Sequence, residues 1–103
     1  MKYKTRACRI ESKGNIWSIF DLKSGHEFFR GKFNGGNERH IFGYVACFAT
    51  LYDFLRLDFQ LTGQALMEDF TRMARMVQVP SQSVSMRLHG EDKAGREIDI
   101  DLN

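Results

Sequence analysis

The residues of this chain best suited to metal binding or nucleophilic catalysis are three histidines and two cysteines. His26 and Glu27 begin like the helix motif of zinc proteases, but Arg30 stands where the second histidine ligand would be. The candidate ligands show no paired zinc-type spacing; they are Cys8, His26, His40, Cys47 and His89. We therefore expect no metal ion and no cofactor.

Cys47 is the candidate nucleophile, since His40 precedes it by seven residues. A reactive thiolate needs a partly exposed, electropositive setting. Cys47 lies instead in the apolar run VACFAT, and a helix would place His40 about two turns away, too far for a hydrogen bond. We predict that Cys47 is a core residue, and because no serine-nucleophile elbow is present we expect no catalytic residues.

Basic side chains suggest a second kind of chemistry, the binding of phosphates. The candidates are Lys2, Lys4 and Arg6 on one side of an N-terminal strand, then Arg30, Lys32 and Arg39. Aromatic rings that could stack on single-stranded bases are interleaved with them, at Tyr3, Trp17, Phe28 and Phe29. However, the net charge is only +2 and no nucleic-acid-binding signature is present, so this function is the alternative.

Charge is spread unevenly along the chain. Residues 1–50 hold nine Lys and Arg against four Asp and Glu, whereas residues 51–103 hold six against nine. The two halves therefore carry +5 and −3. Opposite charges of this kind attract one another within one chain or between two copies.

Period-two patterns predict three N-terminal strands, over 2–10, 16–22 and 26–33, which form an antiparallel meander. The sequence NGGN at 34–37 predicts a turn. It leads either to a further strand, as in a type I′ hairpin, or directly into a helix.

Two central helices are predicted, over about 40–54 and 62–78. The first has an apolar face and a strip of small residues, although a strand over 38–48 stays open. Residues 55–61 alternate strictly and are either a strand or an extended connector. The second helix has Thr62 as its N-cap and Pro80 as its stop signal.

Two alternating segments at the end of the chain predict a β-hairpin, over 83–89 and 96–102. The expected fold class is therefore α+β, with one or two antiparallel sheets and both helices on one face. The length of 103 residues predicts a single compact domain spanning residues 1–103.

Several observations indicate a soluble, cytoplasmic protein. The longest nearly apolar run, residues 41–52, falls short of the ~20 residues that a membrane span needs. No apolar segment of a signal peptide follows the basic start, and both cysteines are expected to be free thiols.

The expected function is that of a non-catalytic protein-interaction module that binds another protein or a second copy of itself. Aromatic residues reach 13% and there are five methionines, and both types are enriched in interface cores. The expected interface residues are Met67, Met73 and Met76 on the second helix. A further alternative is a small-ligand pocket between sheet and helices, formed by Trp17, Tyr44 and Tyr52 with Arg30 or His26 at its mouth.

Overall fold

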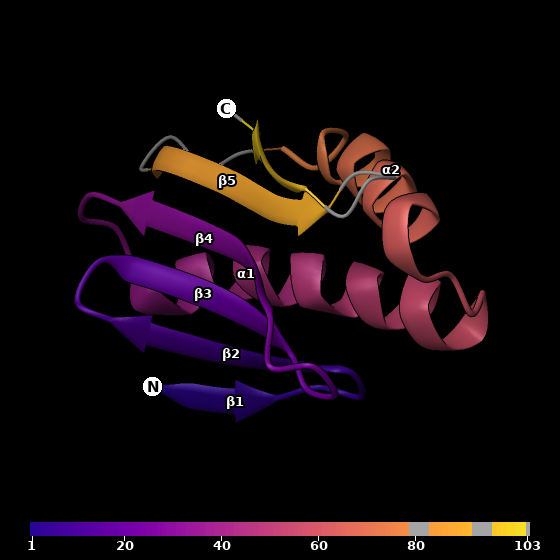
Figure 1. Cartoon of the computed structure of the whole chain (residues 1–103). Coiled ribbons are helices and arrows are strands. Elements are labelled where there is room, and N and C mark those ends of the chain that lie inside the picture. Colours follow the sequence, from indigo (N-terminus) through magenta and orange to yellow (C-terminus); the bar gives the residue numbers. More distant parts are fainter. Residues whose placement is uncertain (79–82, 92–95, 103) are drawn as a thin grey trace.

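The computed structural model describes residues 1–78, 83–91 and 96–102. Within them, six strands form one antiparallel sheet in the order of the chain (Figure 1). The strands are β1 (Lys2–Lys4), β2 (Cys8–Lys13), β3 (Ile16–Asp21), β4 (Glu27–Phe33), β5 (Ser83–Glu91) and β6 (Glu97–Asp101). Between β4 and β5 lie α1 (Glu38–Asp53), the π-helical turn η1 (Phe54–Asp58) and α2 (Gly63–Ala74).

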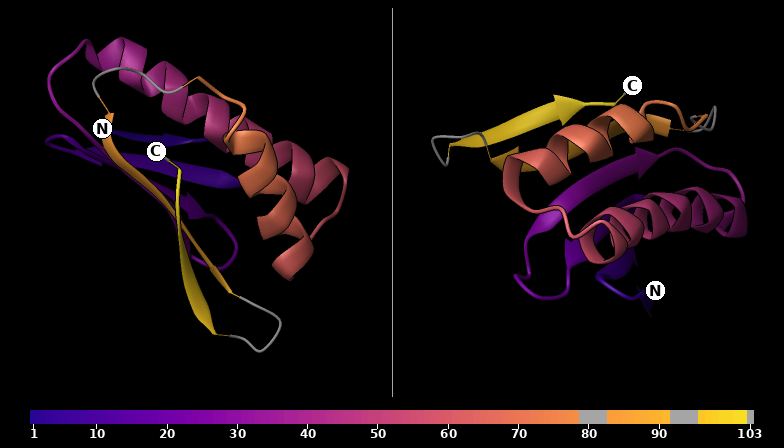
Figure 2. Two further views of the ribbon diagram at one scale, coloured as in Figure 1. Left: turned by 90° about the horizontal axis from the view of Figure 1, so that it is seen from above. Right: turned by 90° about the vertical axis from the view of Figure 1, so that its right-hand side faces the viewer.

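Both helices pack on the same face of the sheet (Figure 2). Helix α1 lies over β2 and β3, and α2 lies over β5. The core forms between the sheet and these two helices, and the opposite face of the sheet is open to solvent. The structure thus confirms the predicted α+β fold, with all the described strands in a single sheet.

The pairing register explains which side chains reach the core. Ile10 lies opposite Ile19, Ile19 opposite Phe29, and Phe29 opposite Leu88. All four are fully buried, and Ile100 on β6 continues the same row. Because side chains alternate between the two faces of a strand, the neighbouring residues point to the open face.

A β-bulge in β4 places two consecutive phenylalanines in the core. The register shifts so that Ile19 faces Phe29 while Phe20 faces Glu27, which leaves Phe28 as the extra residue. Phe28 stacks on the Tyr52 ring at a centroid distance of 3.9 Å. Strict alternation could not have predicted this arrangement.

The predicted first strand, residues 2–10, divides into β1 and β2. The carboxylate of Asp53, at the end of α1, causes the division by holding a tight turn between them. It accepts hydrogen bonds from the Thr5 hydroxyl at 2.8 Å, the Arg6 amide at 3.2 Å and the Ala7 amide at 2.9 Å. A buried carboxylate needs such donors, and the turn supplies three of them.

Residues 38–48 form a helix and not the alternative strand. The chain leaves β4 through NGGN, where Gly35 and Gly36 have φ values of 67° and 85°, and enters α1 directly. Asn37 is the N-cap, and its side chain accepts a hydrogen bond from the Arg39 amide at 2.8 Å. The hairpin alternative is therefore wrong.

Residues 55–61 are neither a strand nor an extended connector. Helix α1 continues into η1, where Leu55 is buried while Leu57 and Phe59 are exposed. The Leu61 amide then donates to the Leu55 carbonyl at 3.0 Å, after Gln60 at a positive φ of 56°. This burial follows from helical geometry, which alternation alone does not indicate.

The predicted second helix and C-terminal hairpin are both present, as α2 and as β5 with β6, but their ends differ from the predicted ones. Thr62 occupies the N-cap position of α2, but its side chain makes no capping hydrogen bond. The helix ends at Ala74, and the predicted stop residue Pro80 is outside the described residues. Among the described residues, no helix has the length and apolar character needed to cross a bilayer.

Candidate interaction groove at the edge of the sheet

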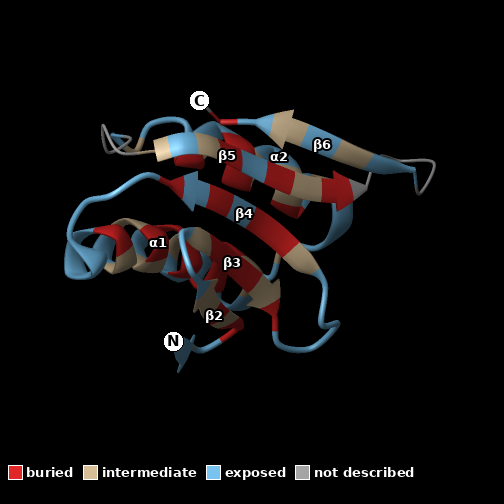
Figure 3. Ribbon diagram, turned by 90° about the vertical axis from the view of Figure 1, so that its left-hand side faces the viewer, coloured by how far each residue is buried: buried red, intermediate tan, exposed pale blue. Residues whose placement is uncertain are grey.

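The helical layer is narrower than the sheet beneath it. Six strands spaced by ~4.8 Å are roughly 24 Å across, whereas two packed helices cover only about 20 Å. Helix α2 reaches β5, and the edge strand β6 extends beyond it. No residue of β6 is buried: exposed and half-buried residues alternate along it (Figure 3).

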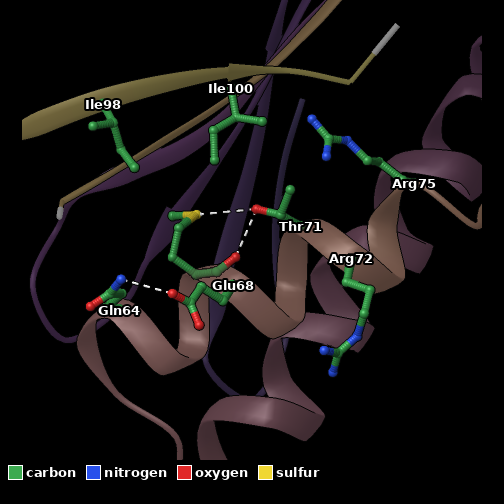
Figure 4. A pocket seen from close by; sticks show the side chains of 8 residues that line it. Gln64, Glu68, Thr71, Arg72, Arg75, Ile98 and Ile100 are labelled. Atoms are coloured by element: carbon green, nitrogen blue, oxygen red, sulfur yellow. Dashed lines mark hydrogen bonds between the residues drawn. The ribbon is translucent and has the colours of Figure 1, made fainter.

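This uncovered strip forms a groove between α2 and β6, with a volume of about 410 Å³. Ile98 and Ile100 point from the sheet toward the helix (Figure 4), and Met67 of α2 also lines the groove. These three side chains make an apolar floor. Polar side chains of α2 and of its C-cap residue form the rim: Gln64, Glu68, Thr71, Arg72 and Arg75.

Hydrogen bonds hold part of the rim in place. The Thr71 hydroxyl donates to the Met67 carbonyl at 2.7 Å and lies 3.7 Å from the Met67 sulfur. The Gln64 amide donates to Glu68 at 2.7 Å. The groove wall is therefore ordered by contacts within α2.

The two arginines of the rim differ in their surroundings. Arg72 donates to Asp69 at 2.7 Å and points away from the groove (Figure 4). Arg75 extends toward Ile100 at the end of the groove and makes no ion pair within the described part of the chain. It can therefore receive a carboxylate or a backbone carbonyl from a bound molecule.

The backbone of β6 is open along the side of the groove away from β5. The Leu102 amide donates to the Met86 carbonyl at 2.8 Å, toward β5. Because alternate residues direct their amides and carbonyls to opposite sides, those of Glu97 and Asp99 point to the free edge. No described strand pairs with that edge.

An open strand edge beside an apolar groove is the arrangement used for β-strand addition. An extended segment would hydrogen-bond to the edge of β6, and every second side chain would enter the groove. Residues Glu97, Asp99 and Asp101 place three carboxylates on the opposite, open face of the sheet. The other side chains of the segment would lie beside these carboxylates.

The predicted basic residues divide between two parts of the molecule. Lys2, Lys4, Arg30 and Lys32 share the open face of the sheet, as their pairing register shows. Arg6 lies in the turn after β1 and pairs with Asp58 at 2.7 Å, which raises the pKa of Arg6. Arg39 lies at the start of α1, in the helical layer, and the structure does not bring it to the basic face.

The aromatic rings predicted to accompany the basic residues are on the opposite side of the sheet. Trp17, Phe28 and Phe29 are buried, and Tyr3 packs edge-on against Phe42 at 5.3 Å. The open face does contain Phe20, but the Arg9 guanidinium covers it at 4.5 Å from the ring centroid. The basic face therefore lacks the predicted platform for stacking bases.

The predicted interface methionines occupy three different environments. Met67 lines the groove, Met73 is half-buried against the core, and Met76 is 80% exposed just beyond α2. The structure brings only Met67 to the groove. The methionine pattern could not indicate which side of α2 is uncovered.

The residues of the predicted small-ligand pocket are likewise separated. Tyr52 and His26 line a second cavity of about 160 Å³, next to the groove. Tyr52 is engaged there, because its hydroxyl donates to Asp21 at 2.6 Å. Trp17 is buried elsewhere, and Arg30 lies on the opposite face of the sheet.

The two cysteines lie in different environments. Cys47 is exposed on α1, so the prediction that it belongs to the core is wrong. The helix turns Val45 and Phe48 inward instead. Cys8 is the buried thiol, and burial together with the Asp53 carboxylate raises its pKa far above the ordinary value. Cys8 is therefore held in the unreactive thiol form.

Neither the sequence nor the structure of this protein is matched in comparisons with protein-family models, curated proteins and solved structures. A function for this protein must therefore be inferred from the chemistry of its own surface. A signal for the groove was present in the sequence EIDID, where apolar and acidic residues alternate at the end of the chain. What the sequence could not show is that α2 leaves those isoleucines half covered.

Proposed function

We propose that this protein is a non-catalytic protein-interaction module that binds an extended segment of a partner protein along β6. The observation that supports this function is the free edge of β6 beside the groove lined by Met67, Ile98 and Ile100. Backbone hydrogen bonds would provide much of the affinity, and the groove would select the side chains. Acting as an adaptor, regulator or inhibitor is consistent with this mode of binding.

The surroundings of β6 define the chemistry of the partner segment. Side chains that enter the groove meet an apolar floor and should be apolar. Side chains on the other parity lie beside Glu97, Asp99 and Asp101 and should be basic. The partner segment is thus an extended run in which apolar and Lys or Arg residues alternate.

A reducing, cytoplasmic location belongs to the same proposal. Both cysteines are free, and Cys47 is exposed to solvent. An exposed free thiol is best tolerated where thiols are kept reduced.

The direct test measures binding of fluorescent peptides by anisotropy. One peptide alternates lysine and valine, a second has the same composition in blocks, and a third alternates glutamate and valine. We expect the first to bind more tightly than the other two, because only it presents apolar and basic faces in strand geometry. Equal binding of the blocked peptide would show that charge alone causes the association.

Two variants of one residue isolate the strand edge. Asp99→Ala removes a carboxylate that lies against the His89 ring, and Asp99→Pro removes in addition the amide that faces the free edge. We expect the proline variant to bind roughly tenfold less tightly than the alanine variant, the effect of about one lost hydrogen bond. Equal affinities would contradict strand addition.

A third variant fills the groove without altering the edge. A Cβ atom at Gly90 would meet the Met67 side chain, with its Cγ at 2.9 Å, and push it into the groove. We therefore expect Gly90→Ala to weaken peptide binding.

Saturation of the groove by a small apolar molecule with no response to the peptides would favour the ligand-binding alternative.

One observation favours the nucleic-acid alternative: part of the open sheet face is rich in basic side chains. These side chains are Lys2, Lys4, Arg9, Lys13, Arg30, Lys32 and Arg87. Without exposed stacking rings, such binding would depend on phosphates and fall steeply between about 50 and 200 mM salt. Filter binding of a single-stranded oligonucleotide at both salt concentrations tests it, and affinity unchanged by salt would contradict it.

A further inference from the structure

The opposite edge of the same sheet has the features that β6 requires of a partner. Strand β1 reads Lys-Tyr-Lys, so Lys2 and Lys4 lie on the open face while Tyr3 lies on the face toward the helices. All three are exposed, and Tyr3 retains 50% of its accessible surface. An apolar ring between two lysines is the alternation that the groove and the carboxylates of β6 select.

The backbone of β1 is also correctly oriented. The Ser12 amide donates to the Met1 carbonyl at 3.0 Å, and the Thr5 amide to the Cys8 carbonyl at 2.8 Å. The alternate residues, Lys2 and Lys4, therefore point their amides and carbonyls to the free edge. On β6 the residues whose backbone groups face the edge are the acidic ones, so hydrogen bonding would place lysine directly opposite carboxylate.

Strand direction allows this pairing to repeat. Consecutive strands alternate in direction, and with six strands β1 and β6 run antiparallel to each other. A second copy placed beside the first, in the same orientation, would bring its β1 antiparallel to β6. The sheet would continue with both helical layers on one face and no change in pairing type.

Within one molecule the two edges cannot meet, because the four other strands separate them. Pairing between identical edges is disfavoured, since β1 against β1 places lysines opposite lysines. For β6 against β6 the opposed groups are carboxylates, and like charges directly opposite each other destabilise a sheet. The charge pattern thus discourages both symmetric dimers and permits the mixed contact.

We propose that the occupant of the β6 groove is β1 of a second copy of this chain, so that copies join head to tail through one continuous sheet. This inference rests on the proposed function of the groove. In the joined state Lys2 and Lys4 lie beside Asp99 and Asp101, and Tyr3 packs over Ile100. Because the contact joins two different surfaces, it produces rings or filaments and does not stop at a dimer.

Reversing the charge of each edge in turn tests the contact. Variant A is Lys2→Glu with Lys4→Glu, and variant B is Asp99→Lys with Asp101→Lys. Their matched control is Arg30→Glu with Lys32→Glu, which reverses two charges on the same face away from both edges. Sedimentation velocity on the untagged chain, from low to high micromolar concentration, measures the assembly.

We expect the unchanged chain and the control to form a series of oligomers that shortens as salt is raised. Variants A and B alone should assemble roughly tenfold less readily, because every contact opposes like charges. A mixture of A and B should assemble again, since each edge of one variant is complementary to an edge of the other. Recovery on mixing is the specific signature of head-to-tail pairing.

Three results would overturn the inference: a monomer at every concentration, a species that ends at a dimer, or oligomers that both variants still form alone. None of these results refutes the groove itself, because the peptide experiment tests it independently. If the peptides bind but the chain stays monomeric, the partner strand comes from another protein. If peptides fail to bind while oligomers form, the proposed function fails and the oligomers use another surface.

Discussion

Replacing Asp53 by alanine should greatly destabilise the fold, because this buried carboxylate holds the turn that creates strand β1. It is only 3% exposed and accepts hydrogen bonds from the Thr5 hydroxyl and from the Arg6 and Ala7 amides. The Ala7 amide is buried and the Thr5 hydroxyl is half-buried, so water cannot fully replace the lost acceptor for either donor.

The expected loss in the free energy of unfolding follows from those two donors. A hydrogen bond to a charged group contributes about 1.5–3 kcal/mol, so two at the lower end give a loss of about 3 kcal/mol. For a domain of this size, that loss lowers the melting temperature by about 15 °C. Urea unfolding followed by circular dichroism measures the free energy, and differential scanning calorimetry measures the midpoint.

A matched control is available in the same turn. Asp58 also binds this segment, through the Arg6 guanidinium at 2.7 Å, but both side chains are exposed. Asp58→Ala should therefore leave the melting temperature nearly unchanged, because water replaces an exposed ion pair. If the two variants lose similar stability, the buried carboxylate does not organise the turn, and the explanation for the division of residues 2–10 is wrong.

Three further predictions concern the interior. In the native protein a thiol reagent should modify Cys47 alone, and Cys8 should react only after unfolding; two reactive thiols before denaturation would contradict the assigned burial. Burial raises the pKa of Asp21, but the Tyr52 hydroxyl and two backbone amides outweigh burial and hold it below the ordinary value of 3.8. The stability from this group is therefore complete above pH 3.8 and is lost as pH falls toward the lower folded pKa. Tyr52→Phe should weaken that acid dependence in urea titrations, and an unchanged slope would refute the assignment. Gly31→Ala should cost about 1–3 kcal/mol, because the added Cβ would lie 2.8 Å from a buried phenylalanine ring; thermal melts would detect it, and an unaltered midpoint would contradict the packing.

Much of the fold could be predicted because the spacing of apolar residues and the residues of the turns agree with the tertiary structure. The face with Ile41, Val45 and Phe48 has helical spacing and is buried, and the C-terminal hairpin alternates as an edge pair should. The wrong prediction of a single strand over residues 2–10 has its cause in a distant residue that decides local structure. Asp53 bends residues 5–7 from 46 to 48 positions away, and no local pattern contains that information.

The candidate site was less predictable, for a related reason. The sequence indicates which side chains share a face, but not how far a helix extends over a sheet. The alternating pattern places Lys2 and Lys4 on one strand face, but it cannot show that Arg6 lies in the turn after β1. The uneven charge of the two halves had no assigned location until the sheet order put one lysine-bearing strand and one acidic strand at opposite edges.

The central claim, that β6 accepts an added strand, is tested most directly by an NMR titration of the isotopically labelled chain with the alternating lysine–valine peptide. Strand addition predicts large shifts and new protection from hydrogen exchange at the amides of Glu97 and Asp99, which face the open edge. The Ile98 and Ile100 amides face β5 and should gain little protection. Shifts confined to residues of the open sheet face, with no added protection along β6, would contradict the account.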